Sequence, residues 1–368
     1  MKKTKNKLYF LIEILSRKIW ITLSIFSTIF LLIGGSVYYF LDKNVRESLA
    51  EQILHRQQIA VRSSSIAVHG FFETVEKSMI FMSKEQDLLS FNTDSQNIMD
   101  RYIDEWEDTP IASIIQINTK GDIIRSSDDK NGLLGVEVNV SDREYFQLAM
   151  QKKENDEEKV IFADPFIAKD VGGYKDAFIL PMAIPMFENG EIKGVFAVGI
   201  SVSHLKEEYL NPLKISENSQ IYFINEKGTF ISSYFPELMG KNIDEVLQGT
   251  DFPEKEDFIS LIKDRLGTKE EGKFNVTLPS EFNKLTNYRK MLFSYSPIDC
   301  GDGMGYLAIG TPLKHIDYYI NPTSNIYSFA VFALVFYMII STVISLLIFR
   351  VIQKIAYFEG YSKAKKEE

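Results

Sequence analysis

The fold is decided by a stretch that occurs twice, as IIQINTKGDIIRSS at 114–127 and as IYFINEKGTFISSY at 221–234. The two copies share the core I-N-x-K-G. Asn and Gly supply the backbone freedom that a tight turn needs, and β-branched and aromatic residues on both sides favour a pleated, half-buried surface. Each copy therefore predicts a strand, a turn and a second strand.

Two further signatures follow each copy in the same order. The first is an apolar pair followed by a glycine, at 133–135 and at 238–240. The second closes each segment: AIP at 183–185 leads to GVFAVG at 194–199, and YSP at 295–297 leads to GYLAIG at 305–310. Matched signatures in a fixed order indicate a duplication. They predict two α+β modules, 92–208 and 209–320, each a mostly antiparallel sheet covered by helices, with Asn211-Pro212 as the joint.

Two windows without charged residues flank this region. They are 20–41, with 22 residues, and 326–349, with 24. Each is long enough to cross a hydrocarbon core of about 30 Å. A cleaved signal peptide and a buried core helix are the alternatives, but a signal peptide's apolar run is usually about 7–15 residues, and no cleavage site follows Tyr39. The sequence predicts two transmembrane helices.

Charge sets the expected orientation and narrows the function. Six Lys and Arg residues precede the first window and five follow the second, so the positive-inside rule places the tails 1–19 and 350–368 in the cytoplasm and the middle outside. Residues 42–325 carry 46 of the 50 acidic and 30 of the 41 basic residues, a formal charge of −16. That balance argues against nucleic acid as a partner. A single cysteine, Cys300, with four histidines argues against a disulfide framework, a metal site and a Cys/His nucleophile. We expect no cofactor.

The segment 42–91 contains no proline and one glycine, and its apolar residues recur at spacings of three and four. This periodicity predicts a long helix leaving the membrane. A helix that covers a sheet has the same pattern, and the two roles are compatible.

Two short pieces, SDREYFQLA at 141–149 and DPF at 164–166, complete a resemblance to the double Cache family of extracytoplasmic sensors, which occur in chemoreceptors and sensor kinases. The resemblance covers about 20–350. It implies an α+β fold with two PAS-like modules in series behind a long N-terminal helix, flanked by two transmembrane helices. It also implies a small-molecule ligand in the membrane-distal module, 92–208.

The residues that this resemblance singles out have suitable chemistry. Arg143 offers a planar fork of donors for a carboxylate, Tyr145 and Phe146 offer apolar walls, and Asp164 offers an acceptor for an ammonium or hydroxyl group. Each also has a plain structural reading: an arginine stacked over a ring, an aromatic residue in the core, and an aspartate that ends a strand before proline. Loop 168–176, with Tyr174 and Asp176, is either a cover for the ligand or a simple hairpin turn.

The sequence departs from the amino-acid-binding branch of that family at two positions. Ser201 stands where the branch has an acidic residue for the ligand's amine, and Val138 stands where it has tyrosine. We therefore expect a small carboxylate, or another polar metabolite able to use Arg143 and Ser201. The second module shows only a polar loop at 281–288, so we expect it to couple the first module to the second span.

The sequence thus predicts a membrane-bound extracytoplasmic sensor, a homodimer in which closure of the first module shifts the long helix and, through the second module, the second span. Only 18 residues follow Arg350, so the output is expected from a separate cytoplasmic partner or to be lost by truncation. No G-x-S-x-G, H-E-x-x-H or phosphate-binding glycine loop is present in context, which predicts that the chain is not an enzyme. The alternative is a structural two-span protein such as a surface-polysaccharide chain-length regulator, for which circular dichroism would show mostly helix.

Overall fold

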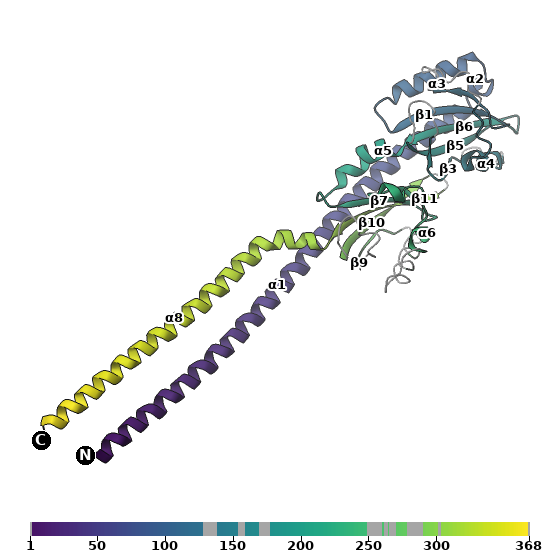
Figure 1. The fold of residues 1–368 in the computed structure, drawn as a ribbon. Coiled ribbons are helices and arrows are strands. Elements are labelled where there is room, and N and C mark those ends of the chain that lie inside the picture. Colours follow the sequence, from purple (N-terminus) through teal and green to yellow (C-terminus); the bar gives the residue numbers. More distant parts are fainter. Residues whose placement is uncertain are drawn as a thin grey trace. The chain divides into compact units, whose positions relative to one another are not determined.

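A computed structural model describes residues 2–127, 138–153, 159–168, 177–248, 260, 264, 270–277, 290–300 and 303–366. The chain divides into two compact units. One unit, Glu51–Lys314, contains every strand that the structure describes (Figure 1). The other consists of Met1–Ala50 and His315–Glu368 and is helical where it is described.

The first sheet has six strands, all paired antiparallel. Their order is β2-β1-β6-β5-β3, and β4 also pairs with β5. The strands are β1 Ile111–Asn118, β2 Ile123–Ser126, β3 Ile161–Phe162, β4 Phe166–Ile167, β5 Phe178–Glu188 and β6 Glu191–Ser201. The helices of this part are α2 Gln86–Leu89, α3 Thr93–Glu105 and α4 Glu144–Met150.

The second sheet has five antiparallel strands in the order β8-β7-β11-β10-β9. They are β7 Gln220–Asn225, β8 Phe230–Ser232, β9 Gly272–Thr277, β10 Lys290–Cys300 and β11 Gly303–Pro312. The 3-10 turn η5 Pro236–Leu238 and helix α6 Ile243–Gln248 follow β8. Between the sheets run α5 Val202–Leu205, a π-helical turn η3 Lys206–Leu210 and a 3-10 turn η4 Asn211–Leu213. The expected joint at Asn211-Pro212 is therefore helical.

The two predicted hairpins are present as β1–β2 and β7–β8, and their turns are built alike. Gly121 has a φ of 87° and Gly228 a φ of 86°, values that glycine adopts without steric cost. The side-chain oxygen of Asn118 accepts from the backbone N–H of Asp122 at 2.9 Å, and that of Asn225 accepts from the backbone N–H of Thr229 at 2.8 Å. The local chemistry of the shared I-N-x-K-G core thus gives the same turn twice. The apolar pair at 133–134 lies outside the described residues.

The long helix α1 runs from Lys2 to Ser83 and so ends before residue 91, where the sequence pattern predicted its end. Glu85 is extended, with a ψ of 123°, and Phe91 has a φ of 52°, so neither residue continues a helix. Apolar spacing carries on through this segment because α2 and the residues after it also face the core. The periodicity alone therefore did not reveal the break.

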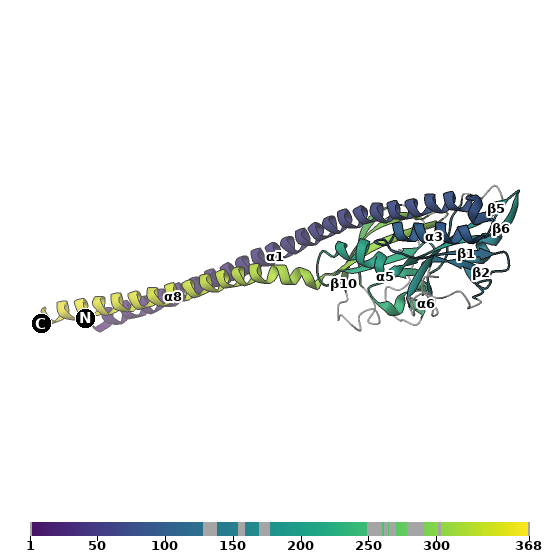
Figure 2. The same ribbon diagram turned by 90° about the horizontal axis from the view of Figure 1, so that it is seen from above.

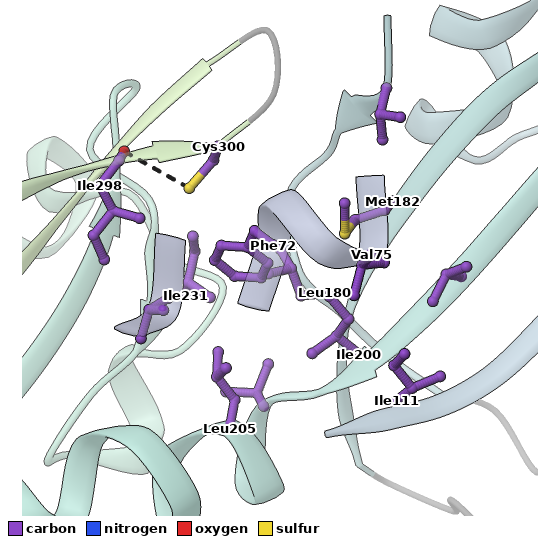
Figure 3. Packing of buried hydrophobic residues seen from close by; sticks show 14 of the residues in the cluster. Phe72, Val75, Ile111, Leu180, Met182, Ile200, Leu205, Ile231, Ile298 and Cys300 are labelled. Atoms are coloured by element: carbon purple, nitrogen blue, oxygen red, sulfur yellow. Dashed lines mark hydrogen bonds between the residues drawn. The ribbon is translucent and has the colours of Figure 1, made fainter. Parts of the chain in front are cut away.

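Helix α1 lies along one face of both sheets (Figure 2). Its buried residues join one hydrophobic cluster with side chains of both sheets and of the segment between them. Phe72, which is 1% exposed, lies at the centre of this cluster (Figure 3). Its ring meets Phe162 of β3 edge-on at 5.1 Å between centroids and lies 6.2 Å from Phe223 of β7. One helix thus supplies a core shared by the two sheets.

Helix α8, Lys314–Lys366, contains the one stretch among the described residues that is long and apolar enough to be a candidate membrane span, Val335–Ile355. It overlaps the second predicted window, 326–349. The first window, 20–41, lies within α1 and remains a prediction.

Candidate ligand-binding site

The candidate site lies on one face of the first sheet, and the strand register shows which residues lie side by side on that face. Ser201 of β6 lies opposite Ile179 of β5, and Ile179 lies opposite Phe166 of β4. Directly opposed residues in antiparallel strands present their side chains on the same face. The neighbouring residues Leu180 and Ile200 belong to the cluster with α1, so this row lies on the opposite face.

Helix α4 covers part of this face. It begins after Arg143, an extended N-cap residue, and buries Tyr145, Phe146 and Ala149. Phe146, 5% exposed, packs in a cluster with side chains of β3, β5 and β6, so it is a core residue. The ring of Tyr145 stacks on Phe166, with centroids 6.1 Å apart and planes 19° apart. Burial raises the pKa of the Tyr145 phenol to about 12.

Arg143 lies over the ring of Phe166. Its guanidinium carbon is 4.8 Å from the centre of the Phe166 ring, and 29% of its side chain is exposed. Stacking uses the flat face of a guanidinium, while the N–H donors point outward in its plane. Among the described residues, the carboxylate of Asp142 lies 4.0 Å from Nε, too far for a hydrogen bond. Both interpretations of Arg143 therefore hold together: it lies over an aromatic ring, and its N–H groups form a donor fork that a carboxylate can meet.

Asp164 is held by a residue of the second sheet. Its Oδ1 accepts a hydrogen bond of 2.6 Å from Nδ2 of Asn225, and its backbone N–H donates to Oε2 of Glu144 at 3.2 Å. The other oxygen of Glu144 accepts from Nζ of Lys227 at 3.0 Å. The strand-ending aspartate thus joins two sheets, and one of its oxygens is already used.

The hydroxyl of Ser201 is engaged locally. It is 1% exposed, accepts from the backbone N–H of His204 at 3.3 Å and lies 3.0 Å from the hydroxyl of Ser203, so it caps α5. Tyr174 and Asp176 lie outside the described residues. The structure therefore brings Arg143 and Tyr145 together on Phe166 and places Asp164 two residues before that ring in the chain. Ser201 lies in the same strand row as Phe166, with its hydroxyl already engaged.

Sequence reasoning missed four contributors: Phe166 as the ring under Arg143, and Glu144, Asn225 and Lys227 as the surrounding polar contacts. Phe166 was visible as the last residue of the DPF piece. Nothing in the sequence pairs Glu144 with a residue 83 positions later. That contact exists only because the two sheets meet.

Two cavities elsewhere have described linings. One of about 450 Å³ lies among α1, α2 and α3, and one of about 300 Å³ lies between α1 and the β10–β11 hairpin. The larger is lined by Phe81, Met82, Glu85, Asp87, Asp94, Asn97, Ile98, Arg101, Tyr102 and Glu105. Among the described residues no three His, Cys, Asp or Glu side chains are grouped to hold a metal ion.

Solved structures similar to this chain include sensor domains of chemoreceptors. The periplasmic sensory domain of the Campylobacter jejuni chemoreceptor Tlp1 has a TM-score of 0.52 at 14% identity, covering 75% of this chain and 97% of that one. The ligand-binding domain of the Pseudomonas fluorescens chemoreceptor CtaA, solved with L-serine, has 0.51 at 12% identity, covering 73% and 98%. An extracellular ligand binding receptor from Desulfohalobium retbaense has 0.49 at 12% identity, and the match covers 68% of this chain but only 39% of that one.

At these identities the structural likeness shows the fold alone. No match was found among curated protein sequences. The family model described as Cache domain, dCache_1, matches residues 45–316, which include both sheets and the part of α1 that packs against them. The chain therefore belongs to the double Cache family of sensor domains.

Proposed function

We propose that this chain is a membrane-anchored extracytoplasmic sensor, which binds a small molecule beside Arg143 in the first sheet and transmits its occupancy through the second sheet to the membrane helices. The observation that carries the proposal is the geometry of Arg143. Its guanidinium lies over the ring of Phe166 and its side chain is partly exposed, so the ring supports the guanidinium while its N–H groups can meet a ligand. Solved neighbours that act as chemoreceptor sensor domains support the same role.

A small carboxylate is the ligand class that these contacts favour. The donor fork of Arg143 suits a carboxylate in two parallel hydrogen bonds. An amino acid would also need acceptors for its ammonium group, and these are reduced here, because one of the two oxygens of Asp164 already accepts from Asn225 and the hydroxyl of Ser201 already caps α5. The site is thus better equipped for an anion than for a zwitterion.

Anchoring in the cell membrane by two spans, with both termini in the cytoplasm, is part of the proposal. Apolar side chains of both terminal helices are exposed, including Phe26 at 72% and Phe332 at 77%. Basic residues follow the candidate span in α8, as the positive-inside rule requires of a cytoplasmic end. Two antiparallel sheets and membership of a sensor family do not favour the polysaccharide-regulator alternative, and we propose binding without catalysis.

Assembly as a homodimer is supported by the outer face of α1. Ile59 and Ile66 are 56% and 65% exposed although they lie in the folded unit. They are seven residues apart and so share one side of the helix. Pairing of this side with a second copy would bury both, and ligand binding would then act on the two α1 helices together.

A thermal-shift screen of the full chain in detergent tests the proposal. Carboxylates, amino acids, amines, purines and sugars are compared, and a ligand at a hundred times its Kd stabilises by about 2.7 kcal/mol. We expect a carboxylate to raise the Tm and Arg143→Ala to abolish the shift. Arg101→Ala, in the 450 Å³ cavity, is the matched control and should keep it. A shift that Arg101→Ala abolishes and Arg143→Ala keeps would move the site to that cavity. A folded protein that responds to no compound would contradict direct sensing of these classes.

A further inference from the structure

The two duplicated turns use their asparagine amides differently. In the β1–β2 turn, Nδ2 of Asn118 donates to Oδ2 of Asp122 at 3.0 Å, inside its own hairpin. In the β7–β8 turn the position of Asp122 is taken by Thr229, which has no carboxylate. There Nδ2 of Asn225 donates instead to Asp164 of the first sheet at 2.6 Å. The second copy has thus turned an internal contact into one between the sheets.

Lys227 of the same turn makes a second contact across the sheets. Its Nζ lies 3.0 Å from Oε1 of Glu144, and Oε2 of Glu144 accepts the backbone N–H of Asp164. The contacts form a closed ring that runs from Asn225 to Asp164, Glu144 and Lys227, because Asn225 and Lys227 lie two residues apart in one turn. This ring of contacts is the feature that we call the inter-sheet clasp.

The clasp surrounds the pair on which the candidate site depends. Glu144 directly follows Arg143 at the start of α4, and Asp164 lies two residues before Phe166, the ring under Arg143. Loss of Lys227 would leave the backbone N–H of Asp164 as the partner that the described contacts give Glu144, so the carboxylate could turn to the guanidinium of the preceding residue, Arg143. It would then compete with an anionic ligand.

We propose that Lys227 is a positioning residue of the ligand site: by holding Glu144, with Asn225 holding Asp164, it keeps the donor fork of Arg143 available to an anion. This inference rests on the proposed function and assigns the β7–β8 turn of the second sheet a role in the site of the first. It also joins the two sheets at the point where ligand would bind, so any movement of α4 on binding is passed to the β7–β8 hairpin.

The charges of the clasp favour this role. Burial alone would raise the pKa of Glu144, but hydrogen bonds from Lys227 and from the backbone of Asp164, with the charge of Lys227, hold that pKa below its usual range. The hydrogen bond to Glu144 raises the pKa of Lys227. Both groups are therefore charged at neutral pH, and the pair is an ion pair.

The rate at which phenylglyoxal modifies Arg143 tests the proposal without any ligand. The full chain in detergent is treated with the reagent, and modification at Arg143 is followed by peptide mass spectrometry. We expect Lys227→Ala to slow it about two- to fivefold, the range set by a partly exposed ion pair between Glu144 and Arg143. Adding Glu144→Gln to Lys227→Ala should restore the original rate, because no carboxylate is left to occupy the guanidinium.

Lys120→Ala is the matched control, since Lys120 has the same place in the β1–β2 turn and should leave the rate unchanged. Lys227→Met keeps the apolar stem and should slow the reaction as Lys227→Ala does, and thermal melts confirm that each variant folds. Faster modification in Lys227→Ala would mean that the clasp merely packs the sheets together and would overturn the proposal, as would an unchanged rate. A failed ligand screen with slowed modification would refute the proposed carboxylate ligand and leave the positioning role intact.

Discussion

Replacement of Phe72 by alanine should destabilise both sheets at once. Phe72 is 1% exposed and its ring contacts Phe162 of the first sheet and Phe223 of the second. Deletion of a fully buried phenylalanine side chain costs about 3–5 kcal/mol, which includes the lost burial and the cavity left behind. Aromatic pairs add about 0.5–1.5 kcal/mol beyond burial, and Phe72 has such neighbours on both sides. We therefore expect a loss of about 4–5 kcal/mol, near the upper end of that range.

Urea unfolding of the full chain in detergent measures this loss. Two probes are followed together in a Trp20→Phe background: fluorescence of Trp106, which lies beside α3, and exchange of amide hydrogens in β10 and β11, in the second sheet. Both transitions should move to lower urea by the same amount in Phe72→Ala, because the residue belongs to a core that the sheets share.

Phe81→Ala is the control, since Phe81 lies on the same helix but is 61% exposed. Its loss should stay within about 0.5 kcal/mol, as for most surface substitutions. A cost below about 1 kcal/mol for Phe72→Ala, or a shift in the first probe alone, would refute the view that one core joins the two sheets.

Three more predictions follow from the described contacts. Gln57 is buried and donates to Oγ1 of Thr311 at 2.7 Å, so Gln57→Ala should lower the free energy of unfolding by about 1–3 kcal/mol in chemical denaturation. Gln52 is exposed on the same helix, and Gln52→Ala should leave that free energy unchanged. The pKa of Tyr145 is raised from 10.0 to about 12, so its contribution to stability is complete below pH 10 and is lost as the pH rises toward 12. Between pH 9 and 12 the free energy of unfolding should therefore fall less steeply with pH in Tyr145→Phe than in the original protein, and equal slopes would disprove the assignment. Burial, with the charge of Asp299, raises the pKa of the Cys300 thiol, so iodoacetamide at pH 8 should label it only after denaturation, and rapid labelling of folded protein would contradict its burial.

The elements that depend on neighbours in the sequence were predicted correctly. Both hairpins form where the I-N-x-K-G core predicted them, because the Asn side chain and the Gly backbone determine such a turn within a few residues. The same holds for the mixed α/β class with two antiparallel sheets and for an apolar window in α8 long enough to span a membrane. The break of α1 after Ser83 escaped prediction because the residues beyond it remain apolar on the core side.

The amino-acid sequence by itself determined where the charged groups of the proposed site stand, since Arg143 and Asp164 were singled out by residue type and by the resemblance. Only the tertiary structure decided what each of them meets. Asp164 accepts from Asn225, 61 positions away, and the ring beneath Arg143 belongs to a strand that pairs with β5. Such partners are chosen by how two sheets pack on one helix, and a contact between residues so far apart leaves no periodicity in the chain. The turns could be predicted from local chemistry, whereas the site is formed by distant segments that folding brings together.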